Sequence, residues 1–206
     1  MRRVRAGFSL IELLLVLSVM AILSALLLPS AAPAVREQLY AAAEVLAGDV
    51  AYARTLAVTN GSSYRLAFDC SQSRYVLEHS GTDATLDVLP STPFRAADDP
   101  ATQQIVELSE LPQLSRSGVR LAAVGTMGTL PQPATELEFG PLGATIEADA
   151  TVIWLTAGAG DAQRFLKIRV DPITGLTWVG SFQSSGPPDA IVVTSPPAPP
   201  PLPPGP

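Results

Sequence analysis

The hydrophobic pattern of the chain begins with one long apolar run, from Phe8 to Leu28. From residue 13 onward this run holds no charge, and its only polar residues are Ser18 and Ser24. Its 21 residues are close to the ~20 that a helix needs to cross a bilayer. We therefore expect a membrane helix over residues 8–29. Three arginines lie among the seven residues before it. Because basic clusters stay on the cytoplasmic side, the rest of the chain should lie outside.

A second helical pattern follows the prolines Pro29 and Pro33, which should kink or interrupt the first helix. Apolar residues then recur at steps of three and four, while most charged residues lie off this stripe. Asn60-Gly61 is a typical helix end. We therefore expect residues 30–60 to form the amphipathic second half of one long helix. The stripe consists of Val35, Leu39, Ala42, Leu46, Val50, Ala53 and Ala57.

The period changes to two after residue 61. Residues 64–68, 136–139 and 166–170 alternate between apolar and polar side chains, which predicts half-buried strands. Residues 152–155 form a continuous apolar run typical of a more buried strand, and residues 171–175 read as a hairpin turn. Residues 80–135 show weak periodicity and many prolines, which favours long loops. The fold class expected is α+β, with one long helix packed on an antiparallel sheet.

The last 21 residues change character. Eight of the eleven residues from Pro196 to Pro206 are proline, and proline supplies no ladder donors. We expect residues 186–206 to be an extended or disordered tail that buries almost nothing. The domain predicted from the strand pattern therefore covers residues 61–185.

Charge and composition limit the ligands and reactions that we expect for this chain. The formal net charge is -6, and without residues 1–7 ten basic residues would face nineteen acidic ones. An acidic body repels phosphate, so no nucleic acid is expected as a partner. One cysteine and one histidine exclude a His-Cys metal cluster. Cys70 is expected to be a small buried hydrophobe and His79 a surface or edge residue, so we predict no metal, no cofactor and no enzymatic activity.

Glu12 is the exception within the apolar run. An ionisable side chain in a membrane span is costly and needs a partner. No basic residue lies between Arg5 and Arg36. The partner must therefore come from outside this helix.

Residues 7–12, with the sequence Gly-Phe-Ser-Leu-Ile-Glu, resemble the class III signal of type IV prepilins and type II secretion pseudopilins. The resemblance implies that a prepilin peptidase removes residues 1–7 by cutting between Gly7 and Phe8, and then methylates the amine of Phe8. It implies that Glu12 aligns the subunit with the N-terminal amine of a neighbour during assembly. It also gives Pro29 the role of a helix kink.

Three later segments resemble the GspH/FimT-type domain of minor pseudopilins and minor pilins. Residues 46–54 resemble the family's helix end "L-x-x-D-L-x-x-A-R", with Val50 in place of the second leucine. Residues 139–143 and the pair Thr174-Gly175 resemble its later strand and hairpin signals. The family implies a periplasmic position for this domain.

These resemblances imply a structural subunit: a minor pseudopilin of a type II secretion system. The alternative is a minor type IV pilin for pilus assembly or DNA uptake. Its partners would be the prepilin peptidase, other pilins or pseudopilins, and the inner membrane, which it would cross once with the N-terminus cytoplasmic. Two other interpretations stay open: a conventional secretory signal cut after Ala34 at an Ala-x-Ala site, and a plain signal anchor.

Overall fold

The structure is a computed structural model that describes residues 10–27, 35–91, 99–111 and 118–192. For residues 21–27 it describes the backbone alone. The chain divides into two compact units, Met1–Ala34 and Val35–Pro206. Each unit is described by itself below.

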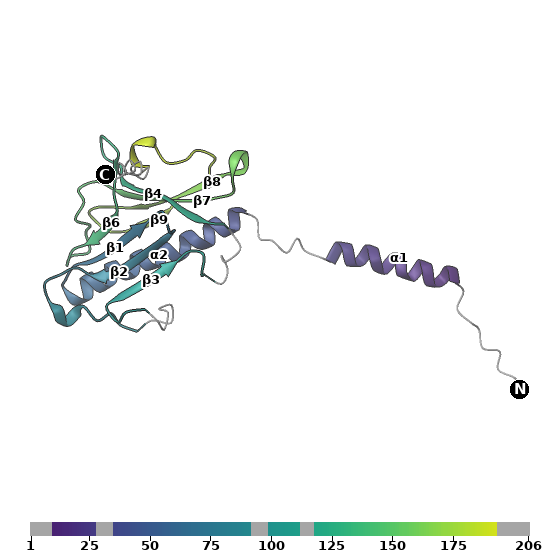
Figure 1. Cartoon of the computed structure of the whole chain (residues 1–206), viewed down its shortest axis with the longest axis horizontal. Coiled ribbons are helices and arrows are strands. Elements are labelled where there is room, and N and C mark those ends of the chain that lie inside the picture. The colour runs from purple at the N-terminus through teal and green to yellow at the C-terminus, as the bar shows by residue number, and fades with distance from the viewer. Residues whose placement is uncertain (1–9, 28–34, 92–98, 112–117, 193–206) are drawn as a thin grey trace, which may run out of the picture. The chain divides into compact units, whose positions relative to one another are not determined.

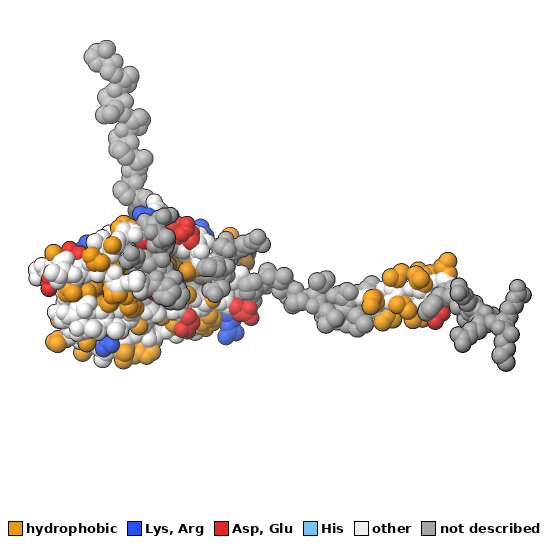
Figure 2. Space-filling view, turned by 90° about the horizontal axis from the view of Figure 1, so that it is seen from below, with side chains coloured by type: hydrophobic (Ala, Val, Ile, Leu, Met, Phe, Trp, Pro, Cys, Tyr) orange, Lys and Arg blue, Asp and Glu red, His pale blue; other side chains and the backbone are white. Residues whose placement is uncertain are grey.

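The described residues of the first unit form one helix, α1 (Leu10–Leu27). Its described side chains are exposed and almost all apolar, as Figure 2 shows for the visible face of this helix. Ser18 satisfies its hydroxyl locally by donating to the Leu14 carbonyl at 2.7 Å. A helix that is apolar on every side is buried against other apolar groups, in a protein core or in a membrane.

The second unit is α+β, as the sequence predicts. Helix α2 (Val35–Asn60) packs on two antiparallel sheets (Figure 1). The four-stranded sheet has the order β3-β2-β1-β6, and the five-stranded sheet has the order β5-β4-β7-β8-β9. The strands are β1 (Tyr64–Asp69), β2 (Arg74–His79), β3 (Gln103–Glu107), β4 (Arg120–Thr126), β5 (Gln132–Pro133), β6 (Glu136–Phe139), β7 (Thr151–Ala157), β8 (Arg164–Val170) and β9 (Thr177–Val179).

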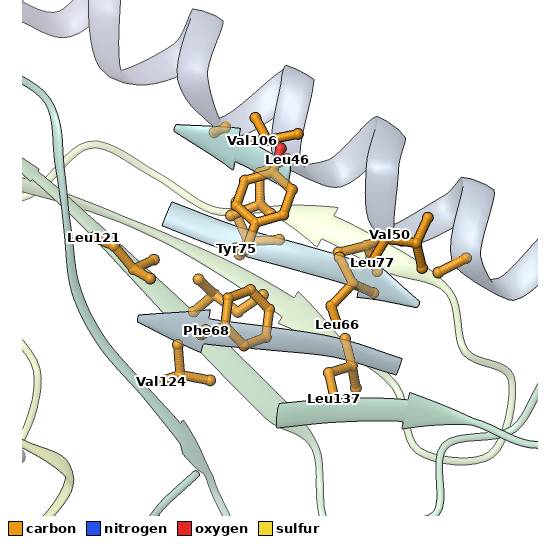
Figure 3. Close-up of a cluster of buried hydrophobic side chains, with 14 of the residues drawn as sticks. Leu46, Val50, Leu66, Phe68, Tyr75, Leu77, Val106, Leu121, Val124 and Leu137 are labelled. Carbon is orange, nitrogen blue, oxygen red and sulfur yellow. The ribbon is translucent and has the colours of Figure 1, made fainter. Parts of the chain in front are cut away.

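The helical stripe predicted from the sequence forms the seam of the core. All its members except Val35 are buried, and Val35 at the first turn is 36% exposed. Figure 3 shows Leu46 and Val50 of α2 pointing toward Tyr75 and Leu77 of β2. Side chains from both sheets join them in one cluster. Burial of a leucine-sized side chain contributes about 1.5–3 kcal/mol, so this seam is what fixes α2 to the sheets.

The strand predictions from alternation are confirmed at β1, β6 and β8, and the apolar run over residues 152–155 lies within β7. The expected turn over residues 171–175 joins β8 and β9, which pair antiparallel. Asp171 builds this turn by accepting bonds from the backbone N–H groups of Ile173 and Thr174. Gly175 has φ +63, which glycine adopts without a steric cost.

The expectation of loops over residues 80–135 is wrong in three places. Strands β3, β4 and the two-residue β5 lie there, and β4 is an interior strand of the five-stranded sheet. Strand β4 does not alternate, because most of its side chains are buried on both faces. Its small residues Ala123 and Gly125 leave room for Ile191, since a Cβ on Gly125 would lie 2.7 Å from Ile191 Cγ2.

The expected boundary of the tail is also wrong. Residues 186–192 belong with the domain: the short helix η3 (Asp189–Ile191) places Ile191 in a small cluster with Ala123, Val152 and Trp154. Ile191 is fully buried. This segment covers part of the outer face of the five-stranded sheet, which is why β7 is buried on both faces. The rest of the predicted tail, residues 193–206, lies outside the described residues.

Candidate functional site

The N-terminal site expected from the sequence lies only partly within the described residues. Gly7, Phe8 and Pro29 fall outside them, as do residues 28–34 that would join the two halves of the expected long helix. Glu12 is described and lies in the first turn of α1 with an exposed side chain. No described residue forms an ion pair or hydrogen bond with it. The carboxylate therefore stands on an apolar helix without a partner inside the described part of its own unit.

A membrane span is not found in the structure: among the described residues, no helix combines the length and the hydropathy that crossing a bilayer requires.

The residues that resemble a GspH/FimT-type helix end have distinct places in α2. Leu46, Val50 and Ala53 are buried, whereas Asp49 turns toward the four-stranded sheet. Tyr75 Oη donates to Asp49 Oδ2 at 2.5 Å, and Gln104 Nε2 lies 3.5 Å from Asp49 Oδ1. The aspartate thus ties the helix to β2 and β3.

Burial governs the protonation of this contact. It raises the pKa of Asp49 above its ordinary value, although the hydrogen bonds from Tyr75 and Gln104 act in the opposite direction. Burial, together with the neighbouring carboxylate, raises the pKa of Tyr75 well above its ordinary value. The tyrosine hydroxyl therefore keeps its proton and remains a donor at neutral pH.

Arg54 ties the other end of α2 to two loops. Its Nε donates to the Thr174 carbonyl at 2.8 Å and lies 3.3 Å from the Gly143 carbonyl. Gly143 and Gly175 both have positive φ, and a Cβ on Gly175 would lie 2.1 Å from the Gly143 carbonyl oxygen. These glycines therefore let the two loops meet at the arginine. The sequence singled out all three segments, but not their contact.

His79 corrects one expectation. Its side chain is fully buried, not at a surface or an edge. Its Nε2 lies 2.7 Å from Ser62 Oγ, and its Nδ1 lies 2.8 Å from Asp87 Oδ1. The order serine–histidine–aspartate is that of a hydrolase triad. A Cβ on Gly81 would lie 2.1 Å from Ser62 Oγ, so the backbone of Gly81 packs against this hydroxyl. We interpret this chain of bonds as a lock between the end of α2 and the loop after β2.

Cys70 corrects another expectation. It is exposed in the turn between β1 and β2 and forms no disulfide. It lines an open depression of about 470 Å³ together with Ser71, Arg120 and Phe165. Partial desolvation, with a smaller effect of Asp69, raises the pKa of its thiol. A thiol with a raised pKa holds less thiolate, so this position does not activate the cysteine as a nucleophile.

The comparison with known families decides the nature of the N-terminus. Residues 2–28 match the family model described as the prokaryotic N-terminal methylation motif. The chain is type IV pilin-like. The match contains Gly7, Phe8 and Glu12, so this pilin-like chain carries the class III signal that its sequence resembles. Its body, residues 35–192, is the α+β domain described above.

Comparison with solved structures gives a distant likeness. Two crystal structures of the type IV minor pilin FimU from Pseudomonas aeruginosa strain PAO1 each share 15% identity with the pilin-like chain. The P21 form has a TM-score of 0.45 and covers 75% of this chain and 96% of its own. The P65 form has a TM-score of 0.42 and covers 74% and 99%. No curated protein matches in sequence.

Proposed function

We propose that this pilin-like chain is a minor structural subunit of a type IV filament machine, processed at its N-terminus and assembled through α1. The observation that carries the proposal is the methylation motif over residues 2–28. The exposed apolar surface of α1 supports it, as does the carboxylate of Glu12, which has no partner in the part of the chain that the structure describes.

Processing at the motif would provide a charged partner for Glu12. Removal of residues 1–7 would create an amine at Phe8, and a protonated amine from a neighbouring subunit is a suitable partner for the carboxylate. Pairing two charges in apolar surroundings lowers the cost of burying each. Apolar contacts along α1 would bring the helices together, and this charge pair would set their axial register.

The same features support a proposal for the location of the chain. We propose that the chain is held in the inner membrane by residues 8–29, with the three leader arginines cytoplasmic and the domain from Val35 onward periplasmic. The prepilin peptidase and other pilins or pseudopilins would be its partners. Two machines fit this role: a type II secretion pseudopilus and a type IV pilus.

Affinity purification from the native cell tests the proposal and separates the two machines. The tagged chain should co-purify with other subunits that carry the methylation motif, and its deletion should impair one process. Loss of protein secretion with intact pili identifies a pseudopilus, and loss of pili with intact secretion identifies a pilus. Recovery of the chain alone, with both processes intact, would refute the proposed role.

A further inference from the structure

The strands of the two sheets carry side chains of opposite charge on their outer faces. The five strands of the larger sheet contain no aspartate and no glutamate. In β8 the side chains of Lys167 and Arg169 are exposed, while their neighbours Leu166, Ile168 and Val170 are buried. Trp178 lies opposite Arg169 in the β8–β9 register and is 51% exposed. We call Lys167, Arg169 and Trp178 the basic patch.

The two positive charges of the basic patch are not paired within the described part of the domain. Neither Lys167 nor Arg169 forms an ion pair with any residue in the described ranges. Lys167 Nζ lies 6.0 Å from the centre of the Trp154 ring. Hydrogen bonds from Thr174 are the main cause of the lowered pKa of Asp171, and the positive charge of Arg169 adds a smaller effect in the same direction. Helix η3 covers other parts of this sheet face but leaves the patch exposed.

The four-stranded sheet has the complementary surface. Alternation places five carboxylates and two arginines on its outer side, so this face has an excess of negative charge. Arg65 pairs with Glu78 at 2.6 Å and lies 3.6 Å from Glu136. Glu138 accepts a bond from Ser80 Oγ and lies opposite Arg65 in the β1–β6 register, but it forms no ion pair within 4.0 Å among the described residues. We call this outer side, with Glu136 and Glu138 on its edge strand β6, the acidic face.

We propose that the basic patch binds the acidic face of a second copy of this chain. The opposite charges favour this contact, and Trp178 supplies apolar area at its centre. Since the two surfaces differ, the contact is heterologous: each copy offers one surface to each neighbour, and the contact repeats instead of closing on a twofold axis. The inference rests on the proposed function in one respect, because a filament machine would gather copies of this chain at one place in the membrane.

Disulfide crosslinking of the full chain in detergent micelles tests the contact. In a Cys70→Ser background, one copy carries Ser181→Cys beside the basic patch, and a second, differently tagged copy carries Thr135→Cys beside Glu136. Both positions are exposed, so neither change removes a charge or Trp178. The mixed crosslink should exceed either crosslink between identical variants, and high salt should suppress it, because salt screens exposed charge pairs.

Charge reversal gives the decisive comparison. Arg169→Glu on the Ser181→Cys copy should reduce the mixed crosslink by about tenfold, and Glu136→Lys on the other copy should restore most of it. Arg36→Glu is the matched control, since Arg36 is also exposed but lies at the start of α2. The proposal fails if no mixed crosslink forms, or if Arg169→Glu has no more effect than Arg36→Glu.

A nucleic acid is the competing ligand for a basic patch with an exposed tryptophan. A 20-nucleotide single strand that binds the chain, loses binding in Arg169→Glu and is indifferent to Glu136→Lys would overturn the self-association proposal. None of these assays requires leader removal or filament formation. A negative result would therefore leave the proposed assembly role intact, and that role has its own test at the N-terminus.

Discussion

Replacing Glu12 by valine should leave the chain in the membrane fraction but reduce its incorporation into filaments by about tenfold or more, the equivalent of at least ~1.4 kcal/mol of lost contact. The substitution removes a charge from an apolar segment, so membrane insertion becomes no less favourable. The incoming subunit, however, loses the ion pair that would fix its axial register. Pull-down of tagged filaments, quantified beside a fractionation of total membranes, measures both effects.

Ser18→Val is the matched control for this experiment. It also replaces a polar residue of α1 by valine, but Ser18 satisfies its hydroxyl within the helix at Leu14. It should therefore enter filaments normally. Equal incorporation of Glu12→Val and Ser18→Val would show that the carboxylate is dispensable for assembly.

Ile191→Ala should lower the free energy of unfolding by about 2–4 kcal/mol, within the range for truncating a fully buried isoleucine. Ile191 is 0% exposed and packs on Ala123, Val152 and Trp154. Its removal leaves a cavity over the central strands that the sheet is too well paired to close. Denaturant unfolding of the full chain in detergent, followed by tryptophan fluorescence, gives the change.

Val192→Ala provides the comparison for that measurement. Val192 is the next residue along the chain but is 39% exposed, so its truncation should cost much less. If both variants unfold at the same denaturant concentration as the unchanged chain, η3 contributes nothing to stability, and the sequence-based boundary of the tail at residue 186 would be restored.

The α2 stripe and the alternating strands β1, β6 and β8 were predictable because one side of each element faces the core and the other faces solvent. Strand β4 was not predictable by this route. A segment from the far end of the chain covers its outer face, so its burial depends on a contact about 65 residues away in sequence, too distant for any local period to record.

The candidate sites divide in the same way. The motif around Gly7, Phe8 and Glu12 is local, and a short stretch of sequence is enough to predict it. The lock around His79 brings together Ser62 and Asp87, which no fixed spacing connects. Arg54 likewise meets Gly143 and Thr174 only because α2 crosses both sheets. The positive φ angles of Gly143 and Gly175 could not be predicted from the sequence, which shows only that glycine is present in two turn-like segments.

The opposite charges of the two sheets were hidden by the overall composition. The whole chain is acidic, with nineteen acidic and thirteen basic residues. The strands of the five-stranded sheet nevertheless contain no acidic residue. Only the sheet order reveals that Lys167, Arg169 and Trp178 share one surface, because they belong to strands that pair in register. A net charge therefore says little about the partner that a single face can bind.

The N-terminus of the mature protein tests the central claim most directly. Mass spectrometry of the chain extracted from native membranes should find a mature N-terminus at Phe8 carrying one methyl group on its amine. This result would show that the chain is processed as a pilin-like subunit and keeps α1. A mature chain that begins at Val35 would contradict the account and establish a conventional secretory signal, and an uncut chain that begins at Met1 would contradict it in favour of a plain signal anchor.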